Sequence, residues 1–131
     1  MADRVPDCPF CNVDSSTVTL WNEHCLFIQD PAHQQVLKHS GIIIPKAHRE
    51  TVFDLSPEEI ANTFELLAEA RAYLDRACQP DGFTIGWSCF PVGGQTIMHA
   101  HLHVIPRFAD EPYAGRGLRW WLKQSSNLRP S

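Results

Sequence analysis

Residues 93–107 read G-G-Q-T-I-M-H-A-H-L-H-V-I-P-R. Three histidines in this segment, His99, His101 and His103, alternate with apolar residues, and a period of two predicts a half-buried strand. Side chains two residues apart on a strand share a face and lie about 7 Å from each other. We therefore expect the three imidazoles on one face of a sheet, where neighbouring rings can converge on a single small ligand.

The turn before the histidines has the composition of an anion-binding loop. Gly93 and Gly94 can adopt backbone angles that other residues avoid, so that main-chain N–H groups can point at a phosphate. Gln95 and Thr96 add side-chain donors directly after the glycines. The sequence thus places a predicted oxyanion cradle next to a predicted nucleophile or metal site.

The composition is that of a single globular domain. Among the 131 residues, 44% are hydrophobic and 20% are charged. A formal net charge of −4 argues against bulk nucleic-acid binding, which needs a basic surface, but leaves small nucleotides open. The sequence has neither an apolar run of about 20 residues nor the apolar region of a signal peptide, so we expect a cytoplasmic protein without a membrane span.

Five segments have the pattern of strands, and one has the pattern of a helix. The predicted strands cover residues 18–21, 25–28, 42–44, 83–89 and 99–104. The helix should begin after Ser56, because Pro57 suits the first helical position and Glu59 completes a capping box. These elements predict an α+β domain with a mainly antiparallel five-stranded sheet and one long helix.

One side of the expected helix carries apolar residues at helical spacing. The residues that we expect on its buried side are Ile60, Phe64, Leu67, Arg71 and Leu74. The acidic residues between them should face water.

The cysteine content indicates a reducing compartment. Five cysteines, an odd number, do not make a complete disulfide framework. Cys8 and Cys11 have the spacing at which two thiolates can bind one zinc ion, whereas the other three lie among apolar neighbours. Two ligands do not complete a zinc site, so the missing ligands must come from elsewhere in the chain.

Three segments together resemble the histidine triad (HIT) family. The run H-A-H-L-H-V-I, residues 99–105, is similar to the family's signature of three histidines that alternate with apolar residues, and the preceding G-G-Q-T resembles its phosphate loop. I-I-I-P-K-A-H, residues 42–48, is similar to the family's strand followed by Pro-Lys and His, and C-P-F-C resembles the opening of a zinc-binding branch. The resemblance runs from Cys8 to about Arg107 and implies a HIT-like domain over residues 1–110.

For the metal, the resemblance implies that His48 and His99 complete a zinc site with Cys8 and Cys11. Four ligands fill a tetrahedral zinc ion and leave no position for an activated water, so this zinc would be structural. His101 then remains as the nucleophile. The resemblance implies the same role, with attack on an α-phosphate and a covalent nucleotidyl-histidine intermediate.

The resemblance also implies the substrate contacts. The groups expected to hold the phosphate are the side chains of His103, Gln95, Thr96 and Ser88 and the main chain at Gly94. Ser88 stands where the family usually has Asn. Asp30 would accept hydrogen bonds from both ribose hydroxyls, although an acid after a strand is equally a turn former. Apolar side chains expected to stack on a purine are Leu26, Ile28 and Ile43.

The implied function is that of a homodimeric nucleotide hydrolase or nucleotidyltransferase. Its substrates would be nucleoside phosphoramidates or dinucleoside polyphosphates with a purine base. Two alternatives stay open. One is a metal-dependent hydrolase in which His99 and His101 bind a catalytic zinc ion. The other is a nucleotide-binding protein without turnover, which is favoured by the departure at Ser88 and by Phe90, which stands where the family usually has Gly.

Residues 111–131 lie outside the resemblance. They are rich in basic and aromatic residues, and residues 116–123 are compatible with a short helix. We expect this tail to pack on its own domain or on a second subunit. The alternative is a lid that meets the leaving group of the substrate.

Overall fold

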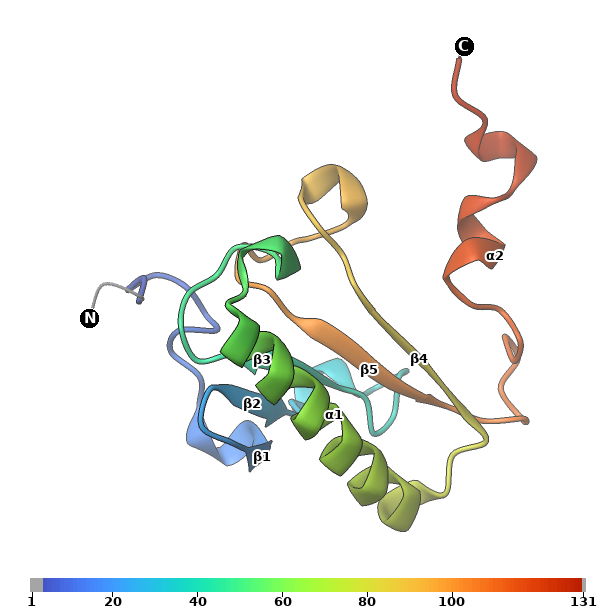
Figure 1. The fold of residues 1–131 in the computed structure, drawn as a ribbon. Helices are drawn as coiled ribbons and strands as arrows, with labels where there is room; N and C mark the ends of the chain where they lie inside the picture. Colours follow the sequence, from blue (N-terminus) through green and yellow to red (C-terminus); the bar gives the residue numbers. More distant parts are fainter. Residues whose placement is uncertain (1–3, 131) are drawn as a thin grey trace.

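A computed structural model describes residues 4–130, and its centre is a five-stranded antiparallel sheet (Figure 1). The strands are β1 (Val18–Trp21), β2 (Cys25–Ile28), β3 (Gly41–Pro45), β4 (Gly82–Trp87) and β5 (Leu102–Arg107), in the spatial order β1-β2-β3-β5-β4. The helices are α1 (Pro57–Cys78) and the short α2 (Leu118–Leu122). The predicted α+β class is confirmed. The predicted divisions 1–110 and 111–131 include residues 1–3 and 131, which lie outside the described residues.

The strand that follows the histidines is shorter than expected. β5 begins at Leu102, so the prediction of a strand over residues 99–104 is wrong at its start. The preceding residues pair with a loop instead of the sheet, because the Ala100 N–H donates to the Arg49 carbonyl at 2.6 Å. Of the three histidines only His103 lies within β5, where it pairs with β3 on one side and β4 on the other.

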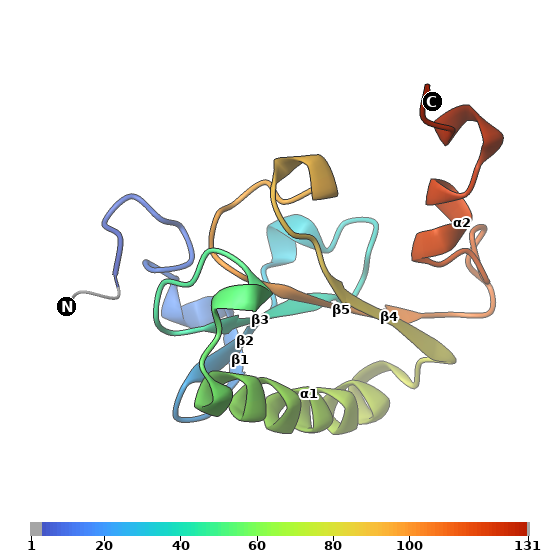
Figure 2. The same ribbon diagram turned by 45° about the horizontal axis from the view of Figure 1, so that its top comes forward.

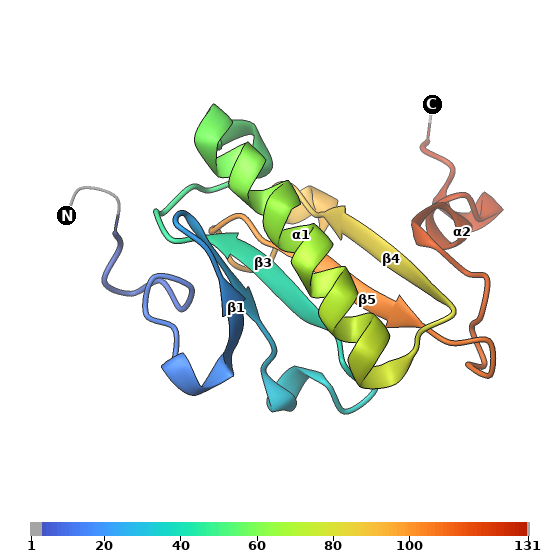
Figure 3. The same cartoon turned by 60° about the horizontal axis from the view of Figure 1, so that its bottom comes forward.

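Helix α1 covers one face of the sheet and leaves the other face open. Figure 3 shows α1 lying across the strands, and Figure 2 shows the loop between β4 and β5 on the opposite side. The residues buried between α1 and the sheet include Phe27, Ile43, Leu66, Leu74, Leu102 and Val104. Since side chains alternate along β5, His103 points to the open face.

The ends of α1 follow from its sequence. The Ser56 side chain accepts from the Glu59 N–H, and the Glu59 side chain accepts from the Ser56 N–H, so the predicted capping box is confirmed. The helix ends at Cys78, and the residue that caps it, Gln79, adopts a left-handed conformation with a φ of 46°. Within residues 4–130, none of the helices combines the length and the apolar character that a membrane span requires.

The buried side of α1 differs from the predicted one. The buried residues are Glu59, Thr63, Leu66, Ala70 and Leu74. Ile60 and Phe64 are instead 42% and 53% exposed, so of the expected set only Leu74 is fully buried. Polar residues can occupy the buried side because the Thr63 hydroxyl donates to the Glu59 carbonyl at 2.7 Å, and because Glu59 is itself paired.

This difference gives a stability prediction with an internal control. We expect Leu66→Ala to lower the free energy of unfolding by about 2–5 kcal/mol, because Leu66 is completely buried and its truncation leaves a cavity. Ile60→Ala, on the exposed side of the same helix, should cost less than about 1 kcal/mol. Urea denaturation of both variants would measure the difference. Equal losses would show that both sides of α1 are buried in solution.

Candidate active site and metal centre

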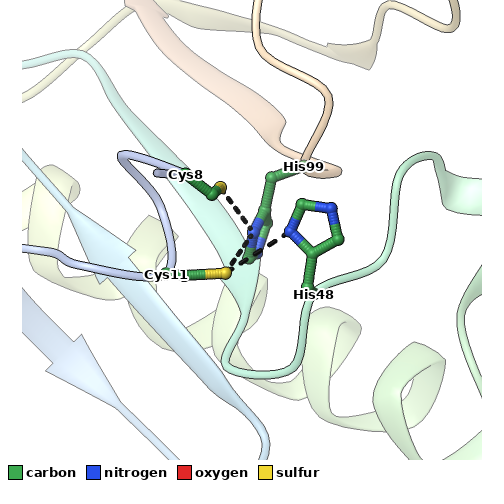
Figure 4. Close-up of side chains that lie close together, drawn as sticks. All are labelled: Cys8, Cys11, His48 and His99. Atoms are coloured by element: carbon green, nitrogen blue, oxygen red, sulfur yellow. Dashed lines mark hydrogen bonds between the residues drawn. The ribbon is translucent and has the colours of Figure 1, made fainter. Parts of the chain in front are cut away.

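The two cysteines of the C-P-F-C segment meet two histidines from distant parts of the chain. Cys8 and Cys11 lie before β1, His48 follows β3, and His99 precedes β5. Figure 4 shows the four side chains facing one another. Their ligand atoms all lie within 4.8 Å of one another. The structure thus brings together all four predicted metal ligands.

The distances between these atoms fit a tetrahedral zinc ion. Sγ of Cys11 lies 3.4 Å from Nδ1 of His48 and 3.6 Å from Nδ1 of His99, and Sγ of Cys8 lies 3.4 Å from Nδ1 of His99. With Zn–S near 2.3 Å and Zn–N near 2.1 Å, a sulfur–nitrogen edge of the tetrahedron is about 3.6 Å long. Two thiolates and two imidazoles are also a ligand set that zinc prefers. The four residues therefore fit a closed, four-coordinate site.

His99 is held in the tautomer that a metal ligand needs. The Pro45 carbonyl can only accept, so Nε2 of His99 donates to it at 2.9 Å and Nδ1 keeps its lone pair toward the cysteines. Burial lowers the pKa of His99 to about 4, which keeps this ring neutral at neutral pH. Burial also raises the pKa of the Cys8 thiol, and a bound cation would oppose this effect by favouring the thiolate.

The loop that carries His48 is fixed from two sides. On one side, Arg49 forms a salt bridge of 3.0 Å with Glu59, which is only 3% exposed. Burial alone would raise the pKa of Glu59, but the hydrogen bonds from Arg49 and from the helix N-terminus outweigh it and lower that pKa. On the other side, the Glu50 carbonyl accepts from Nε2 of Gln95 at 2.6 Å. Sequence reasoning missed the Arg49–Glu59 pair, because no periodic pattern links a loop to a helix start ten residues later.

His101 is buried beside the candidate metal centre, and one of its ring nitrogens is fixed by a hydrogen bond. Its Nδ1 donates to the His99 carbonyl at 2.8 Å, so Nε2 carries the free lone pair of the ring. The residue is 7% exposed and packs against Phe10 and His103, with ring centroids 5.2 Å and 4.9 Å apart. A neutral imidazole with an oriented lone pair can act as a nucleophile or as a base.

A cavity of about 510 Å³ on the open side of the sheet gives access to these rings. His101 and His103 line it, and so do two predicted substrate-binding residues, Asp30 and Thr96. Asp30 also forms a turn, because its Oδ1 accepts from the Ala32 N–H at 3.0 Å. Burial, together with the neighbouring His101 ring, lowers the pKa of His103 and so favours its neutral form.

The apolar wall of this cavity differs from the expected one. Of Leu26, Ile28 and Ile43 only Ile28 lines it, because Ile43 belongs to the core under α1. The neighbouring Ile42 lines the cavity instead, since side chains alternate along β3. Phe10 is a further wall residue that sequence reasoning did not assign to the site, and its place between two metal ligands was the available signal.

Three other predicted substrate contacts do not line the cavity. Gln95 is 4% exposed, and its amide is used internally: its oxygen accepts a main-chain N–H, and its nitrogen donates to the carbonyls of Glu50 and Ile97. Gly94 has a φ of 102°, which favours glycine, and a Cβ there would lie 3.4 Å from the Ser88 hydroxyl. These residues therefore shape the loop, and a direct phosphate contact from them stays a prediction.

The chain belongs to the HIT domain family, because the family model matches residues 13–110. Protein hit of Bacillus subtilis is 30% identical over 107 residues, which cover 78% of this chain and 72% of that protein. Adenylylsulfatase HINT3 of Arabidopsis thaliana is 30% identical over 106 residues, which cover 77% of this chain but only 52% of HINT3. The crystal structure of a Streptococcus mutans protein is similar with a TM-score of 0.75 and 28% identity, covering 90% of this chain and 76% of that one. The predicted family is confirmed.

Proposed function

We propose that the protein is a nucleotide hydrolase or nucleotidyltransferase that acts at the α-phosphate of nucleoside phosphoramidates or dinucleoside polyphosphates. The observation that carries this proposal is the fixed tautomer of His101, whose Nδ1–H is bound to the His99 carbonyl while the ring borders the cavity. Membership of the HIT domain family supports it. So does the relative HINT3, which is named an adenylylsulfatase.

In the proposed first step, Nε2 of His101 attacks the α-phosphorus and forms a nitrogen–phosphorus bond. The bond between phosphorus and the leaving group breaks, and its electron pair departs with that group, which takes up a proton from water. In the second step, water or another acceptor attacks the phosphorus, loses a proton to solvent and regenerates the free imidazole. The neutral His103 ring, next to His101, would donate a hydrogen bond to a phosphate oxygen.

The nucleoside would occupy the remainder of the same cavity. The two carboxylate oxygens of Asp30 suit the two ribose hydroxyls, and Phe10, Ile28 and Ile42 provide apolar surface for a purine. Thr96 borders the cavity and would contact the phosphate. We propose that Gly94, Gln95 and Ser88 contribute through the shape of the loop and its main-chain N–H groups.

We propose zinc as the resident metal, held by Cys8, Cys11, His48 and His99, with a structural role. When bound, it would crosslink the N-terminal loop to the segment that precedes β5. The alternative, a catalytic zinc ion bound by His99 and His101, has less support. Nδ1 of His99 faces the cysteines, whereas Nδ1 of His101 donates a hydrogen bond to the His99 carbonyl, so these two nitrogens do not point at a common ion. The five free thiols suit the reducing cytoplasm that we propose as the location.

We also propose a homodimer. β4 is an edge strand of the sheet, and an uncovered edge favours pairing with another strand. Ile85 of β4 is 40% exposed, and the exposed Phe64 of α1 lies next to Trp87 with ring centroids 6.2 Å apart. A second copy could cover this apolar surface and the edge together. A monomer in light scattering at micromolar concentration would contradict the proposal.

A substrate panel tests the proposed reaction. We expect the purified protein to release a nucleoside monophosphate from adenylyl or guanylyl phosphoramidates, dinucleoside polyphosphates or nucleotide sugars, as followed by chromatography. His101→Asn is the matched control, because it removes the nucleophile and keeps a polar side chain of similar reach. If no member of the panel is cleaved while AMP binds, the alternative of a nucleotide-binding protein without turnover would replace the proposal.

A further inference from the structure

The C-terminal tail, residues 111–130, is anchored to the end of β5 by one arginine. Arg107 pairs with Glu111 at 2.9 Å and donates to the Thr84 hydroxyl and to the carbonyls of Arg116 and Tyr113, each also at 2.9 Å. In Figure 1 the tail leaves the end of β5, and α2 stands beside β4. The family match ends at residue 110, so the tail lies outside the matched domain.

Arg116 of the tail is enclosed by aromatic rings. Its guanidinium carbon lies 4.9 Å from the ring centre of Tyr113, 4.3 Å from that of Trp120 and 6.0 Å from that of Trp121. We call these four residues the Arg116 clamp. Among residues 4–130 no acceptor takes a hydrogen bond from this guanidinium, although the residue is half-buried. The clamp therefore presents a pre-oriented cation with free N–H donors, which is the group that proteins use to bind phosphate.

The Arg116 clamp borders a second cavity, which adjoins the histidine cavity. This second cavity has a volume of about 1010 Å³, and Arg116, Tyr113 and Trp121 line it. Leu37 and Ile105 line both cavities, so the two cavities adjoin at these side chains, and we call the two together the groove.

Strand β5 sets the direction and length of this groove. His103, Ile105 and Arg107 point to the same face because side chains alternate along a strand, and they are spaced about 7 Å apart. The groove thus extends about 14 Å from His103 to Arg107 and the tail that Arg107 anchors. A ligand whose phosphate sits at the histidines would need an extended second half to reach the clamp.

The charges along the second cavity favour an anion. Lys38, Arg107 and Arg116 line it and oppose the two acids Asp110 and Glu111. Glu111 accepts hydrogen bonds from the Phe108 N–H and from Arg107, which lower its pKa, and Arg107 neutralises its charge. The two positive charges of Arg116 and Lys38 therefore remain available for a ligand, and the only negative charge that opposes them in this lining is the exposed carboxylate of Asp110.

We infer that the Arg116 clamp is a second subsite that binds the anionic leaving group of the substrate, the distal polyphosphate of a dinucleoside polyphosphate. This inference rests on the proposed function, and it selects one of the two substrate classes named there. When the bond between the α-phosphorus and the bridging oxygen breaks, the electron pair remains on the departing polyphosphate, so negative charge increases on the group that faces Arg116. The aromatic rings of the clamp can stack on the distal base.

Equilibrium binding to the His101→Asn full-length protein tests the subsite without turnover. The probes are AMP, which reaches only the histidine cavity, and diadenosine tetraphosphate, which reaches both cavities. In this background we expect Arg116→Gln to raise the Kd for the tetraphosphate by roughly 10- to 100-fold, the loss typical of a charged hydrogen-bonding partner. The Kd for AMP should change by less than about twofold. Arg119→Gln is the matched control, because Arg119 is an exposed tail arginine outside the cavity lining.

The outcomes separate this inference from the proposed function. If neither probe binds, the proposed nucleotide site is wrong. If AMP binds, but Arg116→Gln changes the affinities for both probes equally or changes neither affinity, the inference alone is wrong. Arg116→Lys keeps the charge but loses the planar fork, and an intermediate loss for the tetraphosphate would support direct contact. If Arg119→Gln weakens binding of the tetraphosphate as much as Arg116→Gln does, the loss reflects tail packing or overall charge, and the inference is wrong.

Discussion

Replacement of His101 by Asn is expected to lower kcat by roughly 10³- to 10⁶-fold on any substrate that the wild-type protein cleaves. Asn offers no nitrogen lone pair to the phosphorus, so the covalent route is lost. The cavity walls at Asp30, Phe10 and Ile28 are unchanged, and AMP affinity should stay within about threefold. Steady-state kinetics and equilibrium binding on the same preparations would measure both quantities.

His103→Asn is the comparison for this experiment, because it removes the neighbouring ring of the same cavity and keeps the nucleophile. We expect a milder loss of roughly 10²- to 10³-fold, by analogy with the removal of one oxyanion donor. Intact-protein mass spectrometry after an acid-free quench should show a nucleotidyl adduct on His101. An adduct that persists in His101→Asn would assign the nucleophile to another residue and end this mechanism.

The sequence predicted the sheet well where a strong local pattern coincides with a simple pairing. The hairpin of β1 and β2 was predicted at both strands, because Val18–Trp21 and Cys25–Ile28 are apolar runs that flank a polar turn. The capping box at Ser56 predicted the start of α1 for the same reason. Both signals are local, so the bounds of these elements depend little on tertiary contacts.

The predictions that failed depend on tertiary contacts. The buried side of α1 was predicted from hydrophobicity, yet the helix buries Glu59 because Arg49, on a separate loop, neutralises it. The start of β5 was misplaced because Ala100 pairs with that loop and not with a strand. A periodic pattern cannot report partners that come from another part of the chain.

The candidate site shows the same division. The four candidate metal ligands were predicted because their spacing and the family resemblance agree, and the structure brings them together. Gln95 was expected to face the phosphate, but its amide is bound to main-chain groups that only the folded loop supplies. Phe10 was missed as a wall of the cavity because nothing in C-P-F-C indicates which way its ring turns.

Removal of zinc from the proposed site is expected to destabilise the fold strongly. Cys8, Cys11, His48 and His99 belong to segments that are up to 91 residues apart, so a bound ion would crosslink them, and its binding free energy would contribute to folding. With free zinc about 1,000-fold above its Kd, the contribution is about 4 kcal/mol, which corresponds to a decrease in Tm of about 10–20 °C after chelation. Calorimetry with and without a chelator, together with elemental analysis, would measure it.

Cys8→Ser should reproduce the effect of chelation, because it removes one ligand, whereas Cys89→Ser is the control, since Cys89 lies outside the metal centre. Loss of the metal should also weaken AMP binding, because Phe10 lies between two ligands and packs against both His99 and His101, with centroids 5.9 Å and 5.2 Å apart. A catalytic zinc ion would behave differently. If chelation abolished turnover while Tm and AMP affinity stayed unchanged, the metal would have to act on the substrate itself, and the nucleophile would be a metal-bound water instead of His101.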